Sequence, residues 1–283
     1  MDTCDSWSQQ LNQAGYVADD ILAAVCYAVD RLRRPLLVEG PAGVGKTFLA
    51  KALAQCLNKP LVRLQCYEGL DASQALYDWN YAKQLLAAHS AGTGSSVDDL
   101  YGEGYLLERP LLKAIRLRPS PVLLIDEVER ADEEFEALLL ELLGEFQITI
   151  PEIGTIAAQE PPWVLLTSNR SRDLSDALRR RCLYLWLDYP TPERELEIIH
   201  RHVPRLSLEV AQRVVRAAKT LRGWNLLKPP GLAESIDWAK LLAEFDGDGY
   251  SEMTVRWTLS SVLKTQDDWA LVESRGIRAL WTE

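Results

Sequence analysis

A lysine and a threonine follow a glycine-rich turn in the first fifth of the chain. Lys46 and Thr47 come directly after six small residues in the pattern G-x-x-x-x-G-K-[ST], in which backbone N–H groups and the following helix bind a phosphate. We expect Lys46 to reach the outer phosphates and the Thr47 hydroxyl to hold Mg²⁺. A Gly-rich turn beside a surface lysine is the alternative. The loop consists of Gly40, Pro41, Ala42, Gly43, Val44 and Gly45.

Two consecutive carboxylates, Asp126 and Glu127, end the apolar run 122–125. In a Mg²⁺-dependent NTPase, an Asp at the end of a strand holds the metal through water. A neighbouring Glu orients and deprotonates the attacking water. Acids at a buried edge are unfavourable unless they have partners, so a catalytic pair is favoured over a solvated strand end.

Two further polar groups lie near later apolar runs. Asn169 follows the run 164–167, where its amide could bond both the attacking water and the terminal phosphate. Arg179, Arg180 and Arg181 precede another run. One of them could reach a neighbouring subunit and stabilise charge on the transferring phosphoryl group, whereas a solvated basic turn is the alternative.

Alternating strands and helices must position these groups. The alternation predicts a parallel sheet with helices on both faces, that is, an α/β fold. Residues 1–34 and 46–57 are expected to be helical, and a helix over 135–143 is expected to end at Gly144. The expected strands are 36–38, 61–66, 122–125, 164–167 and 183–187, with a β-hairpin at 147–156.

The pattern changes near Pro190. Thr191, Pro192 and Glu193 form a helix start, and only helices are expected beyond it, at 192–202, 208–222, 232–244 and 251–272. We therefore predict a core domain over 1–190 and an all-helical lid over 191–283. The irregular stretch 68–116, with a flexible loop at 91–96, is typical of an insertion.

Composition restricts the class of partner. The 283 residues are 47% hydrophobic and carry a formal net charge of −10. This acidity and the absence of a long basic run in the sequence argue against a nucleic-acid partner. The five scattered cysteines argue against disulfides and a zinc site. No apolar run approaches the ~20 residues of a membrane span, so we expect a cytoplasmic protein. The stretch 58–61 lacks the Asp of an N-K-x-D pattern, which favours adenine over guanine.

Several segments together resemble the AAA+ ATPases and, more narrowly, the MoxR family. They are GPAGVGKT at 40–47, LLIDEVER at 123–130, LLTSNR at 165–170 and LSDALRRRCLYLWLDYP at 174–190. Residues 63–81, 100–112, 146–156 and 228–242 resemble the CoxD-like branch in particular.

The resemblance implies an αβα core with a helical lid that assembles as a hexameric, homo-oligomeric ring with ATP and Mg²⁺ between subunits. It implies an insertion in the second helix, within about 82–105, and a hairpin at about 147–157, both lining the pore or face of the ring. Lys46 and Thr47 would bind phosphate and Mg²⁺, Asp126 would be the metal-side acid, and Glu127 the catalytic base.

Other roles also follow from the resemblance. Asn169 would be the first sensor and Arg181 the residue that acts in trans, with Arg180 and Arg130 as further candidates at the subunit boundary. Many MoxR proteins have an arginine at the start of a lid helix, but this chain has none there, so either Lys228 replaces it or this sensor is absent. Tyr16, Val17 and Phe48 are also expected to lie near the nucleotide.

Related proteins act as chaperone-like ATPases that mature metalloenzymes. The CoxD-like branch resembles the factor for the molybdenum- and copper-containing site of carbon monoxide dehydrogenase, and a protein with a von Willebrand factor A domain is often the partner. We therefore expect ATP-driven remodelling of a client metalloenzyme. A ring ATPase that acts on nucleic acid and a nucleotide-gated scaffold with little turnover are the alternatives.

Overall fold

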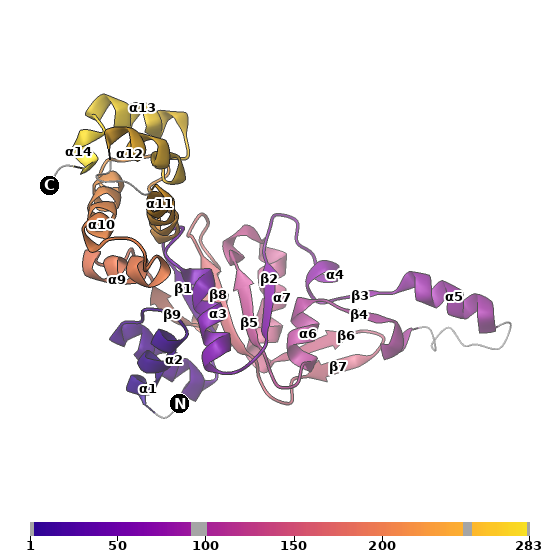
Figure 1. Ribbon diagram of the computed structural model, residues 1–283. Helices are drawn as coiled ribbons and strands as arrows, with labels where there is room; N and C mark the ends of the chain where they lie inside the picture. The colour runs from indigo at the N-terminus through magenta and orange to yellow at the C-terminus, as the bar shows by residue number, and fades with distance from the viewer. Residues whose placement is uncertain (1–2, 92–100, 246–250, 282–283) are drawn as a thin grey trace. The chain divides into compact units, whose positions relative to one another are not determined.

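The chain forms an α/β unit and a helical unit. A computed structural model describes residues 3–91, 101–245 and 251–281 (Figure 1). The first compact unit comprises residues 1–39 and 46–186, and the second comprises residues 40–45 and 187–283.

Five parallel strands form the sheet of the first unit, in the order β2-β5-β8-β1-β9. They are β1 Leu36–Glu39, β2 Leu61–Gln65, β5 Val122–Asp126, β8 Trp163–Ser168 and β9 Leu183–Trp186. Every residue of β1, β5 and β8 is buried, which is why these central strands are continuous apolar runs in the sequence. The predicted parallel sheet is confirmed, and its topology brings the carboxyl ends of β1, β5 and β8 to one edge.

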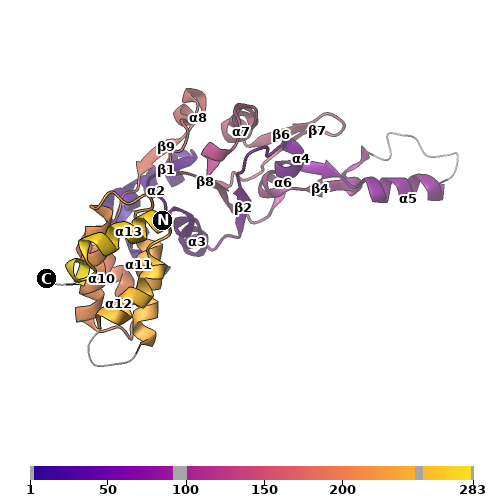
Figure 2. The same cartoon turned by 90° about the horizontal axis from the view of Figure 1, so that it is seen from above.

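Helices flank this sheet. Helices α3 and α7 lie on opposite faces (Figure 2), and a large apolar core includes Leu123, Leu139 and Leu166. The helix α7 runs to Glu145 rather than ending at Gly144, because Phe146 takes the left-handed conformation that caps it. The helices are α1 Cys4–Gln13, α2 Asp20–Leu32, α3 Lys46–Cys56, α4 Ala72–Ala75, α6 Pro110–Arg116, α7 Glu133–Glu145 and α8 Asp176–Arg181.

Two antiparallel pairs leave the sheet. Strands β3 (Tyr77–Trp79) and β4 (Leu106–Glu108) pair, and helix α5 (Tyr81–Ala91) continues away from the sheet beyond them (Figures 1 and 2). This is the region of the expected insertion, and most of the loop expected at 91–96 lies outside the described residues. The second pair is the hairpin of β6 (Gln147–Ile150) and β7 (Gly154–Ala157).

The second unit is helical in its C-terminal part. The predicted single helix over 251–272 is wrong, because two hydroxyls interrupt it. Thr258 turns back to the carbonyls of Thr254 and Val255, and Thr265 caps a new helix by accepting from Asp268 N–H. The helices are α9 Pro192–His202, α10 Leu208–Arg222, α11 Leu232–Glu244, α12 Glu252–Thr258, α13 Gln266–Arg275 and α14 Arg278–Trp281. Among the described helices, none has the length and apolar character needed to cross a bilayer.

Candidate functional site

Lys46 and Asn169 meet at the edge where the central strands end. Lys46 begins α3, Asn169 follows β8, and the lysine Nζ donates to Asn169 Oδ1 at 2.7 Å. The lysine is buried, and this burial lowers its pKa, although the nearby carboxylates of Glu129, Asp126 and Glu127 act to raise it. The structure therefore brings together, at one edge of the sheet, the lysine after the glycine-rich loop and the amide after β8.

Thr47 and Asp126 form a second contact at the same edge. The Thr47 hydroxyl donates to the two carboxylate oxygens of Asp126 at 3.1 and 3.2 Å, and the Thr167 hydroxyl donates to Oδ1 at 2.6 Å. Asp126 is buried at the end of β5. A carboxylate and a hydroxyl are oxygen ligands of the kind that Mg²⁺ prefers, so these residues fit that ion.

Glu127 has different surroundings from the acid beside it. It lies just beyond β5 in the left-handed conformation, and its N–H donates to Thr167 Oγ1 at 2.9 Å. Its side chain is about one-third exposed, accepts from Gln65 Nε2 at 3.2 Å and pairs with Arg130 Nη1 at 3.2 Å. Asp126 is thus enclosed beside a hydroxyl, whereas Glu127 can be reached by water.

A third acid, which no sequence motif indicated, lies at this edge. Glu129 is buried, and its Oε1 accepts from the backbone N–H of Asn169 at 2.9 Å. Its backbone carbonyl accepts from Arg172 Nε at 3.2 Å. Glu129 therefore fixes the backbone of the amide that contacts Lys46. The sequence feature that could have indicated this role is the position of Glu129, two residues after Glu127.

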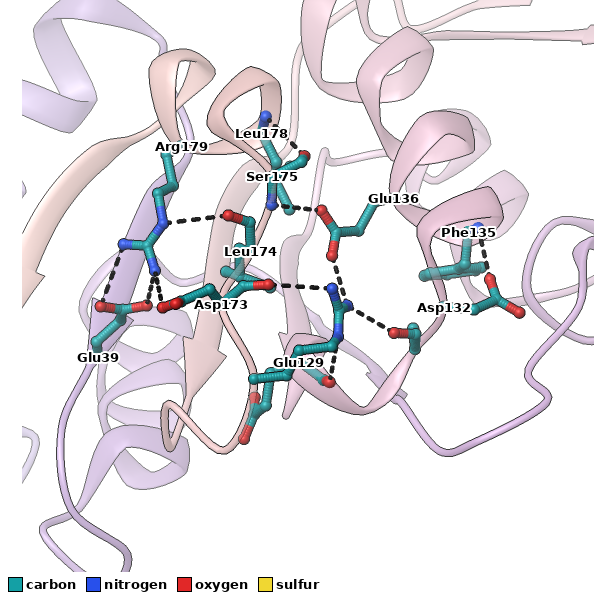
Figure 3. Close-up of polar contacts among 12 residues, drawn as sticks. Glu39, Glu129, Asp132, Phe135, Glu136, Asp173, Leu174, Ser175, Leu178 and Arg179 are labelled. Atoms are coloured by element: carbon teal, nitrogen blue, oxygen red, sulfur yellow. Dashed lines mark hydrogen bonds and ion pairs between the residues drawn. The ribbon is translucent and has the colours of Figure 1, made fainter.

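Helix α8 is attached to the sheet through Arg179. Its guanidinium donates to Glu39 at 3.1 and 3.4 Å, and Glu39 is fully buried at the end of β1 (Figure 3). Arg170 Nε is 3.8 Å from the same carboxylate, and Asp173 is 3.7 Å from Arg179. Arg179 is thus engaged within its own chain.

Glu136 holds the other side of α8. This buried acid of α7 accepts from Ser175 N–H at 2.9 Å and from Arg172 at 2.5 Å (Figure 3). Arg172 also donates to the carbonyl of Ala131 at 2.7 Å, so one arginine joins the segment between β8 and α8 to α7 and to the segment after β5. No sequence motif indicates a role for Arg172 or for Glu136.

Arg180 and Arg181 differ from Arg179. Both are exposed, and within the described part of the chain neither guanidinium makes a hydrogen bond or an ion pair. Their backbone carbonyls, by contrast, accept from Arg34 at 2.5 and 3.2 Å. Arg130, the third candidate for a role at a subunit boundary, is exposed but pairs with Glu127 of its own chain.

The glycine-rich loop lies close to the start of α11 in the second unit. The carbonyl of Gly43 accepts from Ala233 N–H at 3.2 Å, and a Cβ on Gly231 would lie 2.7 Å from the Cα of Gly43. Gly43 itself has a φ of +76°, so a side chain there would be strained as well as crowded by Glu234. The loop thus requires glycine at this position.

Among the residues expected near the nucleotide, Tyr16 and Phe48 lie against each other. Tyr16 is buried and stacks on Phe48, with ring centroids 6.0 Å apart and an interplanar angle of 21°. Val17 is half-buried next to Tyr16. Lys228 is exposed in the helical unit, where its backbone N–H donates to Asp268 at 3.2 Å.

Comparisons with known proteins agree with this geometry. The protein-family model described as AAA domain (dynein-related subfamily) matches residues 35–182. The chain is 27% identical to NorQ of Paracoccus denitrificans over 209 residues, which cover 71% of this chain and 68% of NorQ. It is 25% identical to the denitrification regulatory protein NirQ of Stutzerimonas stutzeri, covering 66% of this chain and 63% of NirQ.

Two further similarities are partial or structural. The chaperone protein ClpB 2 of Parasynechococcus marenigrum is 36% identical over 163 residues, which cover 53% of this chain but only 16% of ClpB 2. A RuvB structure from Thermotoga maritima superimposes with a TM-score of 0.51 at 19% identity, covering 90% of this chain and 68% of RuvB. The RuvB likeness supports the fold alone. The family model matches more than half of the residues of this chain. The chain therefore belongs to the AAA domain family, dynein-related subfamily.

Proposed function

We propose that this protein is a MoxR-type ATPase that hydrolyses Mg²⁺-bound ATP at the boundaries between subunits of a homo-oligomeric ring. The observation that carries this proposal is the joint placement of Lys46 against Asn169 and of Thr47 against Asp126. These pairs join the residues after the glycine-rich loop to the ends of β5 and β8. Membership of the AAA family supports the same activity.

The predicted site residues divide the work in this proposal. Lys46, which follows the loop directly, neutralises the outer phosphates, and the loop N–H groups bind them. Thr47 and Asp126 would hold Mg²⁺, which supplies charge neutralisation at the phosphates when it is bound. Glu127 accepts a proton from the attacking water, and the Asn169 amide, aligned by Glu129, orients that water.

Arg181 completes the site of a neighbouring subunit in this proposal, with Arg180 as the other candidate. Its guanidinium is exposed at the end of α8, while the helix itself is held by Glu39 and Glu136. An arginine finger needs this combination, because it must keep its position and still be available to an anion outside its own chain. Arg130 is a weaker candidate because it is paired with Glu127.

The work done with ATP is proposed to be chaperone-like remodelling of a client metalloenzyme. The similarity to NorQ and NirQ, and to chaperones of the ClpB type over part of their length, supports this class of activity. The CoxD-like branch, the hexameric stoichiometry and a partner with a von Willebrand factor A domain rest on the sequence resemblance alone. A nucleic-acid motor is the second candidate, suggested only by the relation of the fold to such proteins.

One experiment separates these alternatives. Phosphate release from ATP is measured with and without DNA for the natural protein and for Lys46→Ala, and native mass spectrometry gives the size of the assembly. We expect DNA-independent hydrolysis by an oligomer and no nucleotide binding by Lys46→Ala in calorimetry. Hydrolysis that requires DNA would support the motor, binding without turnover would support a scaffold, and undiminished binding by Lys46→Ala would contradict the site.

A further inference from the structure

Arg63 on strand β2 lies against the acid to which we assign the metal. Its Nη2 and Nε atoms donate to Oδ2 of Asp126 at 2.6 and 3.1 Å. The remaining partners of this buried carboxylate are the hydroxyls of Thr47 and Thr167. Arg63 is therefore the one full positive charge bonded to Asp126 among the described residues.

The same guanidinium also reaches the second acid through one intermediate. Arg63 donates to Gln65 Oε1 in a short contact, and this bond leaves the Nε2 of that amide to donate to Glu127 Oε2 at 3.2 Å. Residues 63 and 65 lie on one face of β2, since alternate residues of a strand point the same way. A single edge strand thus contacts both members of the acidic pair.

The pair formed by Arg63 and Asp126 joins an exposed group to a buried one. The arginine side chain is 51% exposed, whereas that of Asp126 is only 4% exposed. A buried carboxylate without a cation is unfavourable, so the bonds from Arg63 offset the cost of burying the negative charge of Asp126. Because half of the guanidinium-bearing side chain is in solvent, the arginine can move aside without being buried elsewhere.

We propose that Arg63 is a positioning residue that serves as the resident cation of Asp126 and couples nucleotide binding to Mg²⁺. This inference rests on the proposed function, because it takes Thr47 and Asp126 as the magnesium ligands. Two cations beside one carboxylate repel each other, so Arg63 opposes the metal when Mg²⁺ is present. When Mg²⁺ is absent, the same guanidinium keeps positive charge near the phosphates and supports metal-free binding.

The experiment measures affinity for a non-hydrolysable ATP analogue by calorimetry, in Mg²⁺ and in EDTA. The readout is the ratio of the dissociation constant in EDTA to that in Mg²⁺, which requires no turnover. In Arg63→Gln we expect this ratio to rise about 5- to 10-fold, a coupling of ordinary size. Arg63→Lys, which keeps the charge but loses the fork, should lie between the natural protein and Arg63→Gln.

Arg109→Gln is a matched control. Arg109 is 42% exposed and pairs with Asp78 at 3.2 Å, away from the acidic pair, so its loss should leave the ratio unchanged. A second readout uses Mg²⁺ alone in a thermal unfolding series. Mg²⁺ should raise the unfolding temperature of Arg63→Gln more than that of the natural protein, since Asp126 then lacks its cation.

The possible outcomes separate this inference from the function on which it rests. A ratio in Arg63→Gln that is unchanged or lower, with normal binding in Mg²⁺, would overturn the role of Arg63 and leave the ATPase proposal standing. No binding of the analogue by the natural protein in Mg²⁺ would instead overturn the proposed function. If Arg63→Gln does not fold, the ratio in Arg63→Lys decides, and a value equal to that of the natural protein counts against the proposal.

Discussion

The acidic pair after β5 and the arginines of α8 show two ways of arranging charge. Asp126 and Glu127 each have partners in their own chain, namely Thr47, Arg63 and Thr167 for the first and Gln65 and Arg130 for the second. Of the three arginines of α8, only Arg179 has such a partner among the residues that the structure describes, namely the buried Glu39. The side chains of Arg180 and Arg181 are exposed although their helix is held on both sides. In the proposed function, the acids that act within one subunit have partners in their own chain, whereas the arginines proposed to act on a neighbouring subunit are accessible at the end of a helix held by Glu39 and Glu136.

Loss of Arg181 should have the largest effect if this contrast reflects function. Arg181→Ala should fold and bind ATP nearly as well as the natural protein, yet hydrolyse it about 10³- to 10⁵-fold more slowly, the range for a missing arginine finger. Phosphate release at saturating ATP measures this loss.

A mixing experiment tests whether Arg181 acts on a neighbour. Rings that combine Arg181→Ala subunits with Lys46→Ala subunits contain some boundaries with both an intact lysine and an intact arginine. Such mixtures should hydrolyse ATP although neither variant does alone. A small loss for Arg181→Ala, with no recovery on mixing, would mean that the exposed arginines form only a solvated surface.

The acidic side of the comparison is tested by Glu127→Gln. This change removes a base and leaves the metal-side acid, so turnover should fall about 10²- to 10⁴-fold while affinity for ATP is retained. Calorimetry and single-turnover kinetics give the two quantities separately. If turnover survived and binding collapsed, the roles of Asp126 and Glu127 would have to be exchanged.

Arg179 and Arg180 lie within one turn of α8, and their substitutions should differ in their effect on the free energy of unfolding. Arg179→Ala leaves the buried Glu39 without its closest cation, and we expect it to lower the free energy of unfolding by about 3 kcal/mol, the low end for a broken buried pair, because Arg170 remains 3.8 Å away. Arg180→Ala should change it by less than about 0.5 kcal/mol. Urea unfolding followed by circular dichroism measures both. Equal values would show that the bond to Glu39 does not hold α8.

Features that depend on local pattern could be predicted from the sequence. The buried runs of β1, β5 and β8 are continuous and apolar, and strands alternate with helices, so the parallel sheet followed directly. The break between α12 and α13 could not be predicted in this way. It depends on Thr258, whose hydroxyl also accepts from Trp238 on a separate helix, a contact that apolar spacing does not reveal.

The same division applies to the candidate site. Lys46, Thr47, Asp126 and Asn169 carry their chemistry in their type and in their place after a turn or strand. Their supporting partners do not. Glu39 is 140 positions from Arg179, and Arg63 is 63 positions from Asp126, so only the assembled sheet brings these charges together. Glu129 is adjacent to the acidic pair, but its role depends on the backbone of Asn169, which is 40 positions away.

The smallest expected effect concerns the enclosed lysine and its response to pH. Burial lowers the pKa of Lys46 from its ordinary value of 10.5, so this side chain loses its proton at lower pH than an exposed lysine does. Affinity for nucleotide should therefore fall several-fold as the pH rises toward 10.5, where an exposed lysine would still be half protonated. In that range of pH the nucleotide-free protein should become slightly more stable, because the unfolded chain then binds the proton more tightly than the folded one.

Lys46→Arg is the control, since its guanidinium stays charged throughout, and its weaker affinity should not vary with pH. Parallel pH profiles for the natural protein and Lys46→Arg would show that another group is responsible, and that enclosure of Lys46 has no consequence for binding.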